Sequence, residues 1–122
     1  MIAISFGDGL TFGSIRARHP PNQSFPMIRH IVFFTAKSPD KIDAICDGLS
    51  LLAEIPHSLK FEISRNSRVD LYGNEVDVVV YGEFADRAAL DAYKAHPNYD
   101  KATSLVRPMR DMRYAADIVV PE

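Results

Sequence analysis

The sequence contains no tryptophan, a single cysteine and no excess of basic residues. Its one cysteine, Cys46, excludes an internal disulfide and any zinc site built from several cysteines. With 14 Lys and Arg against 16 Asp and Glu, the chain has a formal net charge of -2 and lacks the basic surface typical of nucleic-acid binding. We therefore expect no nucleic-acid partner, and the cysteine usage favours a reducing, cytoplasmic location.

Long apolar runs and well-known catalytic motifs are also missing. No apolar run approaches the roughly 20 residues that a membrane-spanning helix needs, so we expect no membrane association. The first apolar run has no basic residues before it and stops at Gly7 and Asp8, which is not typical of a signal peptide. The chain has no glycine-rich phosphate loop, no His-Glu-x-x-His motif and no serine or cysteine nucleophile motif. We expect no metal and no cofactor.

What the chain does contain is typical of one soluble domain. Its 122 residues are 47% hydrophobic and 25% charged, enough apolar material for a single core. Residues 1–26 differ from the rest, because glycines, prolines and few charges gather there. We interpret them as an N-terminal extension with a short hairpin and a proline-rich connector, either an upstream start ahead of Met27 or an added element that packs on the domain. The domain itself is expected to span residues 27–122.

From Met27 onward the pattern predicts strands and helices in a regular order. Strands are expected at 27–36, 58–64, 75–84 and 112–120, where β-branched and aromatic residues gather. Ser38 with Pro39 predicts the start of a helix that ends at Ile55 and Pro56. Asp86 predicts the start of a second helix, and a further helical segment follows Pro97. This order predicts an α+β, ferredoxin-like βαββαβ fold, an antiparallel sheet with helices on one face.

Two of the predicted strands are apolar on both faces. In the first, Ile28, Val32 and Phe34 share one face while Ile31 and Phe33 share the other. Two helices cover only one face of a sheet, so something else must bury the second face. The alternatives are the N-terminal hairpin, which is small, or the same face of another copy. We expect a homodimer.

A few polar residues are candidates for chemistry. His30 shares the inward face of its strand, so it is either a general base in a pocket or a buried, hydrogen-bonded histidine. Tyr93, His96 and Tyr99 recur every three residues across Pro97, and they either line the same pocket or mark the end of one helix and the start of the next. We predict a pocket between sheet and helices, with His30 and Tyr93 as catalytic candidates. The residues predicted to bind a ligand there are Tyr99, His96, Phe34 and Leu90.

Three arginines follow the last predicted helix at a spacing of three residues. Arg107, Arg110 and Arg113 could hold an anion at the mouth of a pocket, or they form a solvated turn balanced by Asp111. The sequence leaves both interpretations open.

Three stretches together resemble a known family. They are the opening strand MIRHIVFF, the helix that ends in Ile55 and Pro56, and the segment from Tyr81 to Val120 that contains Tyr-x-x-His-Pro. These are similar to the stress-responsive A/B barrel domain, a member of the dimeric α+β barrel superfamily, over residues 27 to about 120. The resemblance implies two ferredoxin-like subunits whose sheets close into a shared barrel.

The same resemblance bears on the site. In the polyketide cyclases of this family, a strand-one histidine, a helix tyrosine and a histidine just after the His-Pro turn line a pocket between sheet and helices. His30 and Tyr93 match the first two, but the third position is Tyr99, whose ordinary pKa near 10 makes it a poor base at neutral pH.

Three kinds of function follow from these observations. The first is a protein that binds a small apolar or aromatic molecule without turnover. The second is a cofactor-independent enzyme in which His30 is the base and Tyr93 the donor. The third is an assembly protein whose barrel interface is its main role.

Overall fold

The computed structural model describes residues 26–121, so the hairpin and most of the connector expected in residues 1–26 lie outside it. The first half of the domain contains β1 (Ile28–Ala36), α1 (Ile42–Leu49) and β2 (Lys60–Arg65), with the 3-10 turns η2 (Pro39–Lys41) and η3 (Ser50–Glu54) on either side of α1. The second half contains β3 (Val78–Phe84), α2 (Arg87–Ala95), α3 (Pro97–Val106) and β4 (Arg110–Val119). This order confirms the predicted βαββαβ fold.

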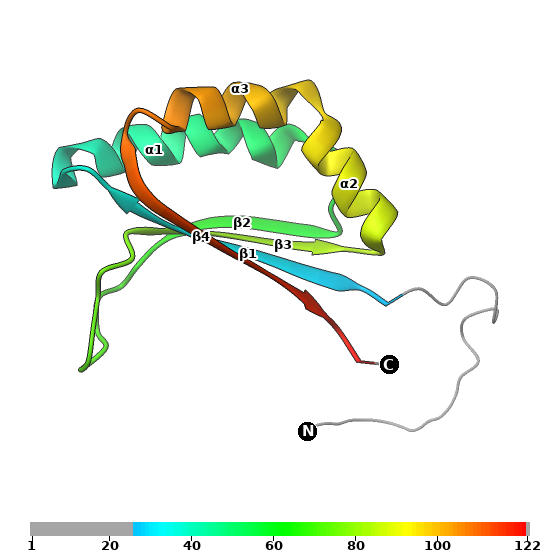
Figure 1. The fold of residues 1–122 in the computed structure, drawn as a ribbon, viewed down its shortest axis with the longest axis horizontal. Helices are drawn as coiled ribbons and strands as arrows, with labels where there is room; N and C mark the ends of the chain where they lie inside the picture. The colour runs from blue at the N-terminus through cyan, green and yellow to red at the C-terminus, as the bar shows by residue number, and fades with distance from the viewer. Residues whose placement is uncertain (1–25, 122) are drawn as a thin grey trace.

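The strands form one antiparallel sheet in the order β2-β3-β1-β4. All three α-helices lie over one face of this sheet, and the opposite face carries no helix (Figure 1). The first and last strands of the domain are neighbours, so side chains of β1 and β4 meet although they are far apart in the sequence. Among the described helices, none has the length and apolarity to cross a membrane.

The helix starts follow the local chemistry of the sequence, with one difference. The Asp86 carboxylate accepts from the backbone N–H of Ala89 at 2.8 Å, as expected of an N-cap. Ser38 occupies the predicted N-cap position before Pro39, but its hydroxyl donates to Asp40 instead of accepting a backbone N–H. The first helical turn after Ser38 is accordingly a 3-10 turn, and the regular helix begins only at Ile42.

His96 joins two helices. It is both the C-cap of α2 and the N-cap of α3. Its extended backbone (φ -68°, ψ 142°) is the conformation that a residue before proline favours. Its Nδ1 accepts from the backbone N–H of Asn98 at 3.0 Å, which satisfies one of the free N–H groups at the start of α3. The turn at His96 and Pro97 therefore joins the end of α2 to the start of α3. This is the structural one of the two interpretations that the sequence left open.

The hydrophobic core lies between the sheet and the helices. The inward side chains of β1 and β3 pack there against α1, α2 and α3; the core residues from these elements include Val32, Val80, Phe84, Ile45, Leu49, Leu90 and Val106. On the opposite face of the sheet, Ile31 and Phe33 remain partly exposed, and Tyr114 and Ile118 of β4 are exposed. This apolar surface, which we call the open face, agrees with the prediction that β1 is apolar on both sides.

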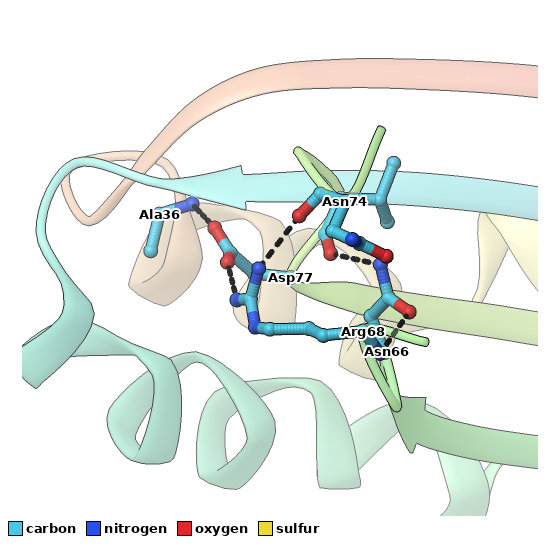
Figure 2. A network of polar contacts seen from close by, with 6 residues as sticks. Ala36, Asn66, Arg68, Asn74 and Asp77 are labelled. Atoms are coloured by element: carbon cyan, nitrogen blue, oxygen red, sulfur yellow. Dashed lines mark hydrogen bonds and ion pairs between the residues drawn. The ribbon is translucent and has the colours of Figure 1, made fainter. Parts of the chain in front are cut away.

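A long loop, residues 66–77, connects β2 to β3 and is called the arm below. It extends away from the sheet on the side opposite to the helices (Figure 1). Figure 2 shows the polar network at its base, where Asp77 accepts from the backbone N–H of Ala36 at 2.7 Å and from the Arg68 guanidinium. Arg68 also donates to the carbonyl of Asn74 at 2.6 Å, and its own backbone has a positive φ of 59°. The network ties the arm to the end of β1.

Candidate functional site

The candidate site begins with His30, which the sheet places directly opposite Asp117. The two residues are cross-strand partners in β1 and β4, so both side chains point to the helix side of the sheet. Nδ1 of His30 lies 2.5 Å from Oδ1 of Asp117. On its other side His30 faces Gly82, where a Cβ atom would come within 2.9 Å of the Phe84 ring. The missing side chain at Gly82 therefore leaves room for the Phe84 ring, which lies edge-to-face with the imidazole.

Burial decides the protonation state of His30. The residue is 1% exposed, and this burial lowers the pKa of its imidazole below the ordinary 6.5; the bond to Asp117 opposes the shift, while the charges of Lys94 and Arg113 add to it. The ring is therefore neutral at neutral pH. A carboxylate can only accept, so Nδ1 carries the hydrogen and Nε2 carries the free lone pair. An imidazole held in this way can act as a general base through Nε2.

Tyr93 projects from α2 into the same layer, in contact with several aromatic rings. Its ring centroid lies 6.0 Å from that of His30, 4.9 Å from Phe84 and 5.4 Å from Tyr99. The side chain is 1% exposed, and its hydroxyl makes no hydrogen bond to any residue within 26–121. Burial raises the pKa of the Tyr93 hydroxyl well above its ordinary value of 10, so the group stays protonated and can act only as a neutral donor or acceptor.

A cavity of about 400 Å³ opens beside these residues, and we call it the α3 cavity. Its apolar wall is formed by Phe34, Leu49 and Val106, and Tyr99 completes it. Tyr99 also contacts the ring of Tyr93, so it lies between the cavity and the His30–Tyr93 layer. The polar lining consists of Lys94, Asp100, Thr103, Arg107, Arg110 and Arg113.

The residues predicted from the sequence fall into three groups. Phe34 and Tyr99 line the α3 cavity. His30 and Tyr93 lie in contact behind Tyr99, without lining the cavity themselves. Leu90 belongs to the core and His96 to the helix joint, and neither lines this cavity.

Several residues of the site were not predicted from the sequence: Asp117, Lys94, and the cavity-lining residues Leu49, Asp100, Thr103 and Val106. Asp117 lies in an otherwise apolar stretch of the last strand, and an acidic residue on the inward side of such a strand is a signal for a buried partner. Lys94 had no local signal, because only the tertiary arrangement of α2, α3 and β4 around the cavity brings it to the arginines. Within the described residues, no group of three His, Cys, Asp or Glu side chains could hold a metal ion.

The fold is a single sheet with helices on one face and a histidine on the inward side of β1. A comparison with known families agrees with this description. A family model described as the stress responsive A/B barrel domain matches residues 28–120. The chain belongs to this family. The match confirms the resemblance inferred from the sequence, and it covers nearly all of the described part of this A/B barrel domain.

Solved structures similar to this A/B barrel domain agree on the fold. A dabb family protein with a ferredoxin-like fold from Mesorhizobium loti is 28% identical, with a TM-score of 0.62 over 80% of this chain and 99% of that chain. A dimeric ferredoxin-like protein of unknown function from Thermobifida fusca is 22% identical, with a TM-score of 0.68 over 85% and 100%. A cofactor-independent oxygenase from Streptomyces nogalater is 12% identical, with a TM-score of 0.60 over 80% and 95%. No curated protein sequence matches the chain.

Proposed function

We propose that this A/B barrel domain binds a small organic molecule with an apolar or aromatic body in the α3 cavity. The observation that carries the proposal is the cavity itself, whose volume of about 400 Å³ lies in the range of small-molecule sites. Its wall of Phe34, Leu49, Val106 and Tyr99 suits an aromatic ring, and the polar groups at its rim can orient one. The cytoplasmic location stays a prediction from the sequence.

We also propose that the protein is a homodimer that pairs through the open face. Ile31 and Phe33 are neighbours of Tyr114 and Ile118 on this face, and no element of the described residues covers it. Apolar side chains grouped on one surface are typical of a protein interface. The similar protein from Thermobifida fusca is described as dimeric, which supports the same arrangement here.

A thermal-shift screen against phenols, aromatic acids and short β-keto thioesters tests the binding proposal. A ligand at a hundredfold its dissociation constant should add about 2.7 kcal/mol to the stability. Thr103 is half-buried and lines the cavity, so we expect Thr103→Phe to fill the space and abolish the shift. The matched control is Ser104→Phe, on the next position of α3, which is exposed and does not line the cavity. The proposal is wrong if Thr103→Phe keeps every ligand-induced shift.

A cofactor-independent enzyme is the second candidate, and the pairing of His30 with Asp117 favours it. This mechanism requires the Tyr99 ring, which separates the α3 cavity from His30 and Tyr93, to move aside. Nε2 of His30 then removes a proton from a carbon acid, and the Tyr93 hydroxyl donates a hydrogen bond to the oxygen that gains negative charge. The neutral state of both groups, set by burial, is the state that this chemistry needs. Turnover of any ligand found in the screen should follow the ionisation of His30 and should be lost in His30→Ala; turnover that survives in His30→Ala would exclude the mechanism.

Tyr93→Phe separates a structural from a functional role of the hydroxyl. Because this buried hydroxyl has no partner within residues 26–121, its removal should leave the free energy of unfolding unchanged or raise it by up to about 1 kcal/mol. A ligand that uses the hydroxyl should bind about tenfold more weakly to Tyr93→Phe. Loss of stability together with unchanged binding would assign the hydroxyl to the fold alone.

A further inference from the structure

Positive charge is concentrated on the rim of the α3 cavity. Lys94 comes from the last turn of α2, Arg107 from the end of α3, and Arg110 and Arg113 from β4. Three elements that are separate in the sequence thus bring four cationic side chains to one cavity, and Asp100 is the one acidic residue in its lining. The whole chain, in contrast, has a net charge of -2.

These cations do not have acidic partners in the described part of the chain. The ion pairs within residues 26–121 involve other residues, although the protein has 16 Asp and Glu. Arg110 donates to the carbonyl of Asp111 at 3.4 Å and Arg113 to the Tyr99 hydroxyl at 3.4 Å, both long bonds to neutral oxygens. Asp111, which could have balanced the arginines, contributes only its backbone carbonyl to Arg110.

Like charges around a concave, partly apolar space raise the local potential and attract anions. The guanidinium group presents a fork of donors that matches a carboxylate or phosphate bidentately, and this explains why arginines rather than lysines dominate such sites. A solvated turn would not need side chains from α2, α3 and β4 to line the same cavity. The position of Lys94, far from the arginine repeat in the sequence, is the decisive feature.

We propose that the α3 cavity binds an organic anion, with its carboxylate or phosphate held by Arg107, Arg110, Arg113 and Lys94 and its apolar part against Phe34, Leu49 and Val106. This inference rests on the proposed binding function and names the chemical class of the ligand. In this orientation the anionic end stays at the rim, and the apolar body extends inward toward Tyr99.

Three probes of matched shape test the inference by calorimetric titration: 3-phenylpropanoate, its neutral amide and phenyl phosphate. The acid should bind at least about tenfold more tightly than the amide, and Arg110→Gln should weaken the acid by about tenfold without affecting the amide. Lys101→Gln is the matched control, since Lys101 is an exposed cation on α3 that does not line the cavity. Binding of the acid should also weaken when the ionic strength rises from about 0.05 M to about 0.5 M.

Each outcome decides between the claims. Equal affinity for acid and amide would overturn the anion inference and leave the binding function standing. Failure of all three probes to bind the wild-type protein would overturn both. A preference between the carboxylate and the phosphate would identify the anion, and unchanged acid binding in both Arg110→Gln and Arg113→Gln would overturn the assignment of the arginines. The arginines lie on the rim, so their replacement should leave the circular dichroism spectrum unchanged, which checks the fold.

A different observation supports a second inference, about the arm. Its tip carries apolar side chains that are almost fully exposed, Val69, Leu71 (90%) and Tyr72 (95%). The tip is nevertheless ordered by its own hydrogen bonds, because the Asp70 carboxylate accepts from the backbone N–H groups of Tyr72 at 2.8 Å and Gly73 at 3.1 Å. Holding apolar side chains in water in a fixed geometry is unfavourable unless they bind something.

The direction of the arm indicates what it binds. It extends to the side of the sheet opposite to the helices, which is also the side of the open face (Figure 1). The base network of Arg68 and Asp77 fixes this direction by attaching the arm to the backbone of Ala36 (Figure 2). A second copy packed on the open face would therefore lie beside the arm.

We infer that the arm is a clasp that packs against a second copy of this chain, with Leu71 and Tyr72 as its main contacts. This inference rests on the proposed homodimer and adds a contact outside the sheet. Aromatic residues that become buried at an interface often contribute much of the binding energy.

Sedimentation equilibrium of the double variant Leu71→Ser with Tyr72→Ser tests the clasp. We expect the dissociation constant of the dimer to rise by at least about tenfold. Leu59→Ser is the control, because Leu59 is also an exposed leucine but lies outside the arm. A dimer with unchanged affinity in the double variant would overturn the clasp and leave the dimer in place. A wild-type protein that stays monomeric at every concentration would overturn both.

Discussion

The two nitrogens of the His30 ring have different environments in this fold. Nδ1 is bonded to Asp117 across the sheet, while Nε2 carries the lone pair in an apolar layer with Phe84 and Tyr93. The bond to Asp117 sets the tautomer, and burial keeps the ring neutral. The chemistry of the residue thus depends on its partner in β4 as much as on its own type.

Replacement of Asp117 by Asn should lower the pKa of His30 further. The hydrogen bond from Nδ1 and the negative charge of Asp117 both raise this pKa, and the isosteric amide keeps an acceptor but removes the charge. The measurement is an NMR titration of the imidazole resonances. Asp111→Asn, on the exposed start of the same strand, is the control and should leave the pKa of His30 unchanged. A rise of the pKa in Asp117→Asn would contradict the direction of the effect.

The lowered pKa of His30 also predicts how stability depends on pH. The folded protein keeps this ring neutral below its ordinary pKa of 6.5, whereas the unfolded chain binds a proton there. The unfolded state therefore binds more protons between the folded pKa and about pH 6.5, so stability falls as the pH drops through this window and is retained above it.

Urea unfolding at a series of pH values checks this dependence. His30→Gln removes the titrating ring, so its stability should change less on acidification than that of the wild-type protein. His57→Gln, which makes the same substitution at an exposed histidine, serves as the matched control. Identical slopes for wild type and His30→Gln would show that another group causes the loss of stability.

For individual residues, the sequence predicted which face of the sheet the His30 side chain points to, but not its hydrogen-bond partner. The alternation of β1 requires His30 to share the face of Val32 and Phe34, and its burial confirms this. The acidic residue in the last strand is a signal for some partner, but its pairing with His30 could not be predicted, because the register of β4 against β1 depends on contacts between residues 87 positions apart. Whether His30 and Tyr93 act in catalysis stays a prediction.

At the joint between α2 and α3, neighbouring residues alone determine where one helix ends and the next begins. A histidine before proline ends one helix through its extended backbone and begins the next through its side chain. Asn98 strengthens the joint, because its side chain donates to the carbonyl of Leu51 in η3 at 3.2 Å. The joint thereby orients α3 against α1, and α3 carries much of the cavity wall.

His96→Ala should lower the free energy of unfolding by about 1 kcal/mol, because the backbone N–H of Asn98 loses its acceptor. His96→Asn can restore the cap, so it should recover most of the loss. Denaturant unfolding of the two variants gives the comparison. If His96→Ala and His96→Asn destabilise the protein equally, capping is not the cause. The imidazole would then stabilise the joint by packing against the His57 ring, whose centroid lies 6.4 Å away.

The sequence predicted best those helix ends that are set by residues adjacent in the sequence. Asp86 and the His96–Pro97 pair mark real helix ends because capping and proline geometry act within a few positions. The 3-10 turns on either side of α1 were not predicted, since the apolar spacing of Ile45, Leu49 and Leu52 fits a regular helix equally well. Their tighter turns follow from packing, which a single sequence does not contain.

In the whole molecule, the two faces of the sheet have different roles. One face and the helices enclose the core, the His30–Asp117 pair and the α3 cavity, while the open face is apolar and carries no helix; its burial by a second copy is the proposal made above. The apolar character of both faces of β1 predicted this division. The gathering of Lys94 with the arginines was beyond prediction, because it requires the positions of α2, α3 and β4 together.

Phe33→Glu should convert the proposed dimer into a monomer. Phe33 lies at the centre of the open face between Val79 and Tyr114, so an interface there would bury a carboxylate without a partner. We expect the dissociation constant of the dimer to rise at least about a hundredfold, measured by light scattering after size exclusion. Leu59→Glu adds the same charge outside this face and should leave the mass unchanged. A dimer that tolerates Phe33→Glu would place the interface elsewhere.

The bond between His30 and Asp117 has a further consequence for synthesis of the protein. It joins the first and last strands of the domain, 87 residues apart, so a growing chain has the histidine long before it has the carboxylate. A product that stops short of Asp117, through early termination or proteolysis, contains His30 and Tyr93 but cannot fix the tautomer of the ring. The NMR signal of the His30 imidazole would therefore report when translation and folding of the last strand are complete.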